Sequence, residues 1–147
     1  MTSDLRSIVT VMKASSDLER MGDHAVSIAR SVIRTKEDRM KRIPEAEVMI
    51  AEMSEIVQAM VQEGIDAYVR RDTKEAYRIA GMDTKVDEHF VAINHFVLKR
   101  MAADPEVVPG GADYISVAGF LERIGDYVTN ICERIVYLEN GEILELN

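Results

Sequence analysis

Apolar residues recur at alternating three- and four-residue intervals along four long stretches of this chain. This spacing places them on one side of an α-helix. In the first stretch, from Ser3 to about Arg34, the series includes Leu5, Ile8 and Met12. Only three prolines occur in 147 residues, so helices of this length can run without interruption. No strand pattern appears, and the sequence therefore predicts an all-α fold of antiparallel helices joined by short connections.

The polar stretch TKEDRMKRI follows the first predicted helix and ends it. Pro44 lies just beyond this stretch and suits the first turn of a second helix, where its missing N–H has no partner to lose. The second apolar series continues from there to about Arg71. These signals predict two long helices joined by a connection of about ten residues.

Two further helices are predicted from capping and turn residues. Asp72 and Glu75 resemble a capping box, although with Asp in place of Ser or Thr, and they begin a helix over residues 73–103. The stretch DPEVVPGGAD reads as a loop from its Pro and Gly content. A last helix is expected over residues 112–139, with Gly141 as its C-terminal stop.

An internal repeat relates the first and last helices. The stretch LERMGDHA begins at residue 18, and LERIGDYV begins 103 residues later. Two helices precede the last one, whereas none precedes the first. If the unit is three helices, residues 41–147 form a complete repeat and residues 1–40 are the last helix of an incomplete one, in a fragment or a natural short form. The first helix should then expose an apolar side, which must pack on the bundle or on another chain.

Acidic residues interrupt the apolar side of these helices. Glu19 and Glu122 occupy core-facing positions in the two copies of the repeated motif. In each copy a glycine follows three residues later and leaves room for a neighbouring backbone, water or ion. Three helices carry such acids four residues apart, and these pairs are Glu19 and Asp23, Asp83 and Asp87, and Glu122 and Asp126.

A carboxylate buried without a partner is costly and tends to take up a proton. One explanation is a hard or borderline cation bridged by carboxylates of facing helices. The alternative is that the acids lie at the edge of the apolar side and pair with bases such as Arg20 or Arg123. The residues alone leave both explanations open.

Composition excludes several classes of function. The net charge of −8 argues against binding to nucleic acid or to anionic membranes. The single cysteine, Cys132, cannot form an internal disulfide or a thiolate zinc cage, and it is expected to be a packed core thiol. No apolar run reaches the ~18–20 residues of a membrane span, and the first residues lack the layout of a signal peptide. These features are compatible with a reducing cytoplasm.

No catalytic constellation is apparent. The chain has no Glu-x-x-His motif, which argues against redox di-iron chemistry. It has no glycine-rich phosphate loop and no Ser/His/Asp or Cys/His set with interpretable spacing. His24 follows the first acidic motif, but tyrosine replaces it in the second copy, so a surface role is expected for it.

The stretches DLERMGDHAVSIA and FLERIGDYVTNICERIVYLENGE resemble the repeated signature of the PhoU family, accessory proteins of bacterial phosphate uptake. SDLR, near the N-terminus, is similar to the start of that family's third helix, and GMDTKVDEHF resembles its middle-helix acidic stretch. The resemblance covers essentially the whole chain. It implies an antiparallel three-helix bundle plus one additional N-terminal helix, which together correspond to the last four of the family's six helices.

The resemblance also implies a metal site. It assigns a transition-metal cluster, most naturally of iron or zinc, to acids of the complete bundle and of the incomplete one, with two asparagines in support. The ligands implied are Asp83, Asp87, Glu122, Asp126, Glu19 and Asp23, with Asn94 and Asn130 as supporting residues.

The function implied is that of a non-enzymatic, cytoplasmic regulator that represses the phosphate-starvation response. It would be an adaptor between the ATPase subunit of the phosphate ABC transporter and a sensor histidine kinase, and it would reach the membrane only through these partners. A homo-oligomer is expected. The alternatives are a PhoU-like C-terminal regulatory domain of a sodium–phosphate cotransporter and a metal-dependent bundle enzyme.

Overall fold

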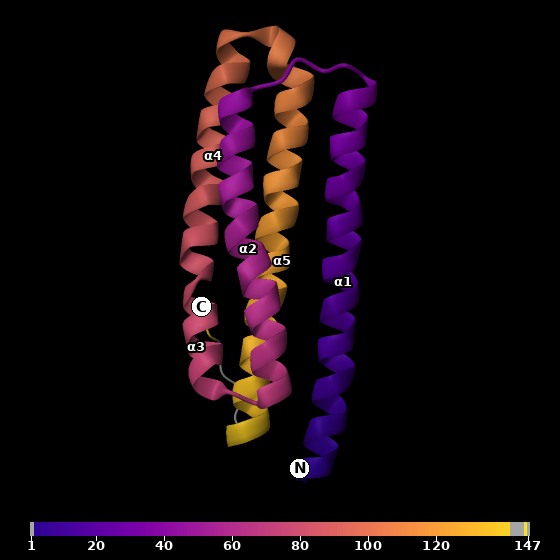
Figure 1. Ribbon diagram of the computed structural model, residues 1–147, viewed down its shortest axis with the longest axis vertical. Coiled ribbons are helices and arrows are strands. Elements are labelled where there is room, and N and C mark those ends of the chain that lie inside the picture. The colour runs from indigo at the N-terminus through magenta and orange to yellow at the C-terminus, as the bar shows by residue number, and fades with distance from the viewer. Residues whose placement is uncertain (1, 142–145, 147) are drawn as a thin grey trace.

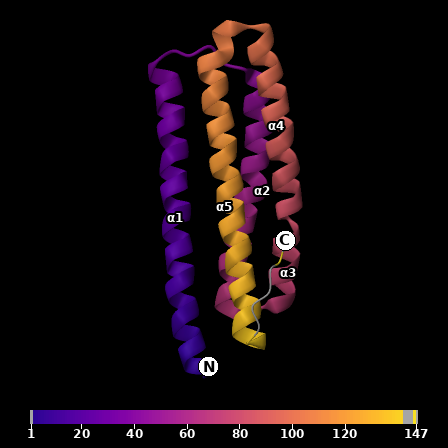
Figure 2. The same cartoon turned by 180° about the vertical axis from the view of Figure 1, so that it is seen from behind.

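Long helices make up nearly all of the computed structural model, which describes residues 2–141 and 146; no strand occurs among them. α1 stands at one side and runs antiparallel to α5, while α2, α3 and α4 pack on the other side of α5 (Figures 1 and 2). The elements in chain order are α1 (Ser3–Glu37), α2 (Pro44–Arg70), α3 (Thr73–Gly81), α4 (Asp83–Ala103), the 3₁₀ turn η1 (Pro105–Val107) and α5 (Val108–Asn140). The predicted all-α antiparallel bundle is confirmed.

Three predicted helix ends are confirmed by their capping geometry. Pro44 is the first residue of α2. The Asp72 side chain accepts a hydrogen bond from the backbone N–H of Glu75 at 3.1 Å and so caps α3. Gly141 ends α5 with φ of 73°, in the left-handed region that glycine enters without steric cost.

The expected single helix over residues 73–103 is wrong, because it breaks at Met82 between α3 and α4. The Met82 N–H bonds the carbonyl of Ile79, three residues back, at 3.0 Å, so the α-helical ladder is interrupted there. Gly81, a weak helix former, immediately precedes the break. As a result Asp83 lies in the first turn of a new helix.

The predicted loop DPEVVPGGAD is largely helical, since α5 begins at Val108 and not near Ala112. The two glycines serve close packing here. A Cβ at Gly110 would lie 2.6 Å from the carbonyl oxygen of Lys41, and one at Gly111 would lie 2.7 Å from the Met101 sulfur. Their missing side chains let the first turn of α5 approach the α1–α2 connection and the end of α4.

Two ion pairs join α1 to α5. Asp17 is 2% exposed, and its carboxylate accepts hydrogen bonds from the Arg134 guanidinium at 2.8 and 3.0 Å. At the opposite end, Arg34 and the Thr35 hydroxyl both donate to the buried Asp113 carboxylate. α1 packs on no other described helix, so these contacts and the apolar contacts between them hold it in place.

The His24 ring stacks against two aromatic rings of α5, and the expected surface role is therefore wrong. Its centroid lies 5.6 Å from that of Phe120 and 5.7 Å from that of Tyr127. His24 and Tyr127 occupy the same position in the two copies of the repeat. When equivalent residues of two antiparallel helices contact each other, an approximate two-fold axis passes between them. The contact of His24 with Tyr127 therefore indicates such an axis between α1 and α5.

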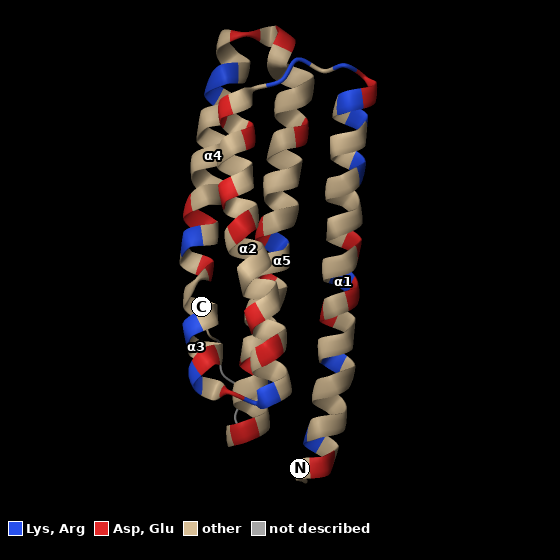
Figure 3. Ribbon diagram, viewed as in Figure 1, with Lys and Arg blue, Asp and Glu red and all other residues tan. Residues whose placement is uncertain are grey.

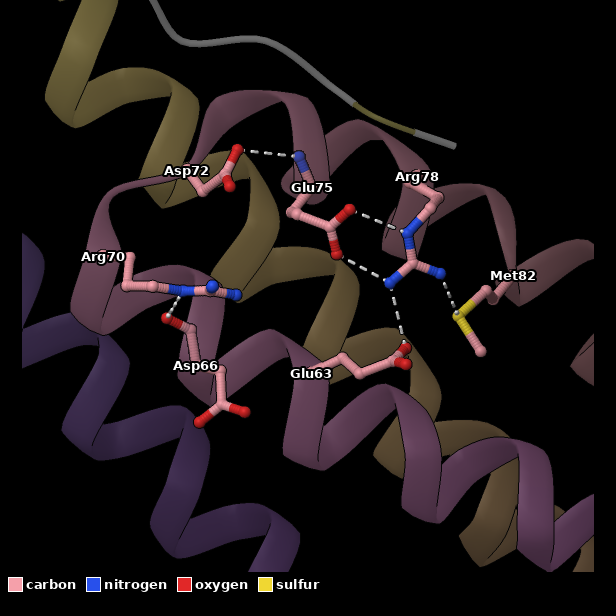
Figure 4. Close-up of polar contacts among 7 residues, drawn as sticks. All are labelled: Glu63, Asp66, Arg70, Asp72, Glu75, Arg78 and Met82. Atoms are coloured by element: carbon pink, nitrogen blue, oxygen red, sulfur yellow. Dashed lines mark hydrogen bonds and ion pairs between the residues drawn. The ribbon is translucent and has the colours of Figure 1, made fainter.

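α3 is held against α2 by a small polar network (Figure 4). The Arg78 guanidinium lies 3.2 Å from the Glu63 carboxylate and 2.7 Å from that of Glu75. Five bases, Arg34, Lys36, Arg39, Lys41 and Arg42, lie at and near the connection between α1 and α2, and other bases and the acids are spread along the helices (Figure 3). None of the described helices is long and apolar enough to cross a membrane. Cys132 is fully buried, as expected.

The buried pair of Asp17 and Arg134 generates a stability prediction. Asp17→Ala should lower the free energy of unfolding by about 3 kcal/mol, because it leaves a partly buried guanidinium without its carboxylate. Chemical denaturation followed by circular dichroism measures this loss. Glu106→Ala, which removes an exposed partner of Lys41, should cost less than about 0.5 kcal/mol. Equal losses in the two variants would contradict the importance of the α1–α5 pair.

Candidate metal centre

Carboxylates from α4 and α5 meet in one cluster. Asp83 and Asp87 lie one turn apart on the same side of α4, and Asp126 faces them from α5. One oxygen from each of the three carboxylates can be chosen so that all lie within 4.8 Å of one another. The structure therefore brings together three of the residues that the sequence assigned to the complete bundle.

Asp83 lies deepest in this cluster. It is 4% exposed, and its Oδ1 atom is buried without a hydrogen-bond partner in the described chain. A Cβ at Gly125 would lie only 3.0 Å from this Oδ1 atom. The glycine of the second motif thus leaves room for a carboxylate of the facing helix, as its position beside Glu122 predicted.

Glu122 is the fourth member of the cluster. It lies one turn before Asp126 on α5 and is partly buried. Burial, then a shared hydrogen bond and the charge of Asp126, raise the pKa of Glu122 to about 7. Burial, then the charges of Asp87 and Glu122, raise the pKa of Asp83 to about 6. The pKa of Asp126 is also raised, chiefly by burial.

Salt bridges do not account for these acids. Within residues 2–141 none of the four carboxylates takes part in an ion pair with a base. Arg123, which the alternative explanation invoked, has its guanidinium 5.7 Å from the centre of the Phe120 ring. Asp87 and Asp126 are exposed, so water can solvate their charge, whereas the buried Asp83 carboxylate needs a bound proton or a cation.

The donor set fits a cation that prefers oxygen ligands. Carboxylates supply all the donors, from two helices that hold them at fixed spacing. The unpartnered Oδ1 atom of Asp83 is the kind of buried acceptor that a metal ion would satisfy. The cluster contains no described histidine or cysteine, so it lacks the nitrogen and sulfur donors of structural zinc sites.

The first copy of the motif forms no such cluster. Glu19 and Asp23 are both exposed, and a Cβ added at Gly22 would meet nothing within 4 Å. The expected core-facing position of Glu19 is therefore wrong in this structure, because no described helix covers that side of α1.

The two supporting asparagines are not brought to the acids by any described contact. The Asn94 amide donates to the backbone carbonyl of Phe90, one turn back in its own helix, at 2.8 Å. Asn130 is partly buried on α5, one turn beyond Asp126. The structure thus separates a four-carboxylate cluster from the remaining predicted residues.

Sequence reasoning overlooked two buried acids that hold the bundle together, Asp17 and Asp113. A signal existed for Asp17, since it lies three residues after Ala14 and four before Met21, both buried on the same side of α1. Neither acid belongs to the cluster, because both pair with arginines between α1 and α5.

Comparison with known proteins identifies relatives of the whole chain. The family described as PhoU domain matches residues 1–32 and 50–135. The chain is 37% identical over 145 residues to the phosphate-specific transport system accessory protein PhoU homolog of Streptococcus pneumoniae serotype 4, and the match covers 99% of this chain and 66% of that protein. A PhoU homolog of the same description from Clostridium acetobutylicum is 38% identical over 144 residues, covering 98% of this chain and 64% of the relative.

Solved structures agree with this match. A crystal structure of the phosphate transport system regulatory protein PhoU from Streptococcus pneumoniae superposes with a TM-score of 0.88 at 35% identity, covering 99% of this chain and 68% of that one. PhoU from Pseudomonas aeruginosa superposes with a TM-score of 0.89 at 35% identity, covering 97% and 67%. The chain thus spans slightly less than two-thirds of the length of the curated relatives it matches.

The raised pKa values generate a prediction for the metal-free protein. Asp83 and Glu122 bind protons more tightly in the folded than in the unfolded chain, so their protonation stabilises the fold at low pH. This stabilisation is complete below about pH 4 and is lost as the pH rises through about 6 and 7. The free energy of unfolding of chelator-treated protein should therefore be higher at pH 5.5 than at pH 8, by on the order of 2 kcal/mol through this cluster. Chemical denaturation at the two pH values measures this difference.

The double variant Asp83→Asn, Glu122→Gln isolates the contribution of the cluster, because amides of the same shape do not titrate. Its stability should vary less between pH 5.5 and 8 than that of the wild type. Parallel pH profiles for the two proteins would show that the cluster does not carry raised pKa values.

Proposed function

Since this chain belongs to the PhoU family, we propose that it is a non-enzymatic regulator of phosphate uptake and of phosphate-starvation signalling. Its relatives are named as accessory and regulatory proteins of phosphate transport, which supports this proposal. The matched residues, 1–32 and 50–135, include both copies of the repeated acidic motif and the four acids of the cluster. In this role the chain acts in the cytoplasm and reaches the membrane through partner proteins.

Its mode of action is that of an adaptor between the ATPase subunit of a phosphate ABC transporter and a sensor histidine kinase. Long exposed helices offer extended surfaces for such partners, and several large apolar side chains remain exposed on α1, α2 and α4. The cluster supports a binding role because its described ionisable groups are carboxylates, the donors that suit cations preferring oxygen ligands.

The acidic cluster is proposed to hold a metal ion or small metal cluster. Asp83, Asp87 and Asp126 would be ligands, with Glu122 beside them. The buried, unpartnered Oδ1 atom of Asp83 is the observation that carries this assignment. An all-oxygen set suits cations that accept carboxylates, such as Mn²⁺, Mg²⁺ or Ca²⁺, and the proposal of iron or zinc rests on the family resemblance.

A bound cation would supply positive charge that offsets the repulsion among these acids. The cluster lies where α4 begins, directly after the break at Met82, and it faces the middle of α5. A bound ion would therefore hold α4 and α5 together through these carboxylates. Without the ion, only bound protons would offset the negative charge of the cluster.

Metal content provides the first test. Glu122→Gln and Asp83→Asn should each lower the affinity for Fe²⁺ or Mn²⁺ by about tenfold or more, because each removes an anionic donor or neighbour. Titration calorimetry and elemental analysis of protein purified without chelator measure this affinity and the stoichiometry.

Glu19→Gln is the matched control for Glu122→Gln, since it makes the same change at the equivalent position of the other motif, which lacks a facing helix. It should leave the affinity unchanged. Wild-type protein that binds no ion, or an equal loss in the control variant, would contradict the proposed site.

Partner binding provides the second test. The purified chain should retain the ATPase subunit of the phosphate transporter and the cytoplasmic part of the sensor kinase from the same organism in a pull-down. Val91→Glu changes an exposed face of α4, and Val69→Glu changes an exposed face of α2. A variant that no longer retains a partner indicates that its helix contacts that partner. Failure to retain either partner, with the fold intact by circular dichroism, would refute the adaptor role.

A further inference from the structure

The helix break at Met82 lies between α3 and the acidic cluster, and two tight turns form it. The Met82 N–H bonds the carbonyl of Ile79 at 3.0 Å, and the Lys85 N–H bonds the carbonyl of Met82 at 3.1 Å. Both bonds span three residues, as in a 3₁₀ helix, and a stretch of this kind inside a helix often marks a hinge. The break is therefore a candidate hinge between α3 and α4.

The local sequence does not force this break. Residues 79–85 contain no proline, and none of them has a positive φ angle. Met82 itself has φ of −65° and ψ of −23°, which lie within the right-handed helical region. A continuous helix is therefore sterically open to this segment, since neither of the usual local causes of a kink is present. The break must be held by the contacts that α3 and α4 make with the rest of the bundle.

On the α4 side this contact is made by Asp83, the first residue of α4. Its carboxylate is buried against Gly125 of α5, and its Oδ1 atom has no hydrogen-bond partner in the described chain. Without a cation this placement is unfavourable, because a buried acceptor has lost its water and gained no donor. An ion bound to Asp83 would remove this cost, and it would therefore stabilise the break itself.

On the other side of the break, α3 is held by few contacts. It has nine residues, fewer than an isolated helix needs to be stable in water. Its buried residues are Ala76, Ile79 and Ala80, so only one of them has a large side chain. Arg78 forms an ion pair with Glu63 of α2, but both side chains are more than 40% exposed, and such pairs are weak (Figure 4). A helix held in this way opens more readily than the long helices around it.

We propose that α3 is a conformational switch controlled by the ion. An ion bound at Asp83 holds the break at Met82 and keeps α3 docked on α2, and loss of the ion releases α3. The switch rests on the metal site proposed above and adds to it the element that responds to the ion. Each residue rewound from 3₁₀ to α geometry would turn α3 by roughly 20° about its axis, which would move Arg78 away from Glu63.

Amide hydrogen exchange of the full chain, followed by mass spectrometry, tests the switch. With Mn²⁺ at a concentration that saturates the protein in calorimetry, exchange in residues 73–82 should slow by about tenfold, because α3 opens less often. Residues 95–103, at the far end of α4, are the internal control and should not change. If Mn²⁺ binds but exchange in residues 73–82 stays the same, the switch is wrong and the metal site stands. If Mn²⁺ does not bind, both are wrong.

Coupling between α3 and the ion is reciprocal, so loosening α3 should weaken ion binding. Arg78→Met removes the ion pair with Glu63 but keeps a long side chain of similar helix propensity, and it should lower the affinity for Mn²⁺ by about threefold. Loss of a positive charge near the acids would by itself raise this affinity, so the direction of the change separates coupling from electrostatics.

Arg100→Met is the matched control, since it removes an ion pair with Glu45 at the other end of α4. It should leave the affinity for Mn²⁺ unchanged. An unchanged or higher affinity in Arg78→Met, or an equal loss in Arg100→Met, would overturn the switch even though the wild type binds the ion.

Discussion

Burial of α5 is the constraint on which the rest of this structure depends. This helix carries buried side chains around most of its circumference, and a helix of that kind must be covered on more than one side. α2, α3 and α4 cover it on one side and α1 on the other. The polar groups that this burial would leave without partners are paired across the contact, Asp113 with Arg34 and Arg134 with Asp17.

The acidic cluster is the exception to this pairing. Asp83 is buried against Gly125 of the central helix, but it faces other carboxylates and no base in the described chain. The helix breaks at Met82, and α4 begins at Asp83. The local geometry of this turn therefore helps to position the Asp83 carboxylate. A bundle that neutralises the buried Asp17 and Asp113 with arginine and leaves the buried Asp83 facing other acids is suited to binding a cation there.

Much of the helical fold could be predicted from local signals in the sequence. The apolar spacing, Pro44, the Asp72 cap and Gly141 act within a few residues of the chain, and all were confirmed. The signals that failed depend on distant segments. The glycines in DPEVVPGGAD suggested a loop because their close neighbours, from residues 41 and 101, are not visible in the local sequence. The stacking of His24 between α5 rings was missed for the same reason.

The repeated motif separates what the sequence by itself determined from what only the tertiary structure decided. The sequence determined that both motifs are helical and that each sets an acid pair beside a glycine on one side of its helix, because helical periodicity is local. The tertiary structure decided that Glu122 joins Asp83 in a partly buried cluster, whereas Glu19 lies in solvent. The physical reason is that burial and pKa depend on which other helix covers a side chain, and α4 covers only the second copy.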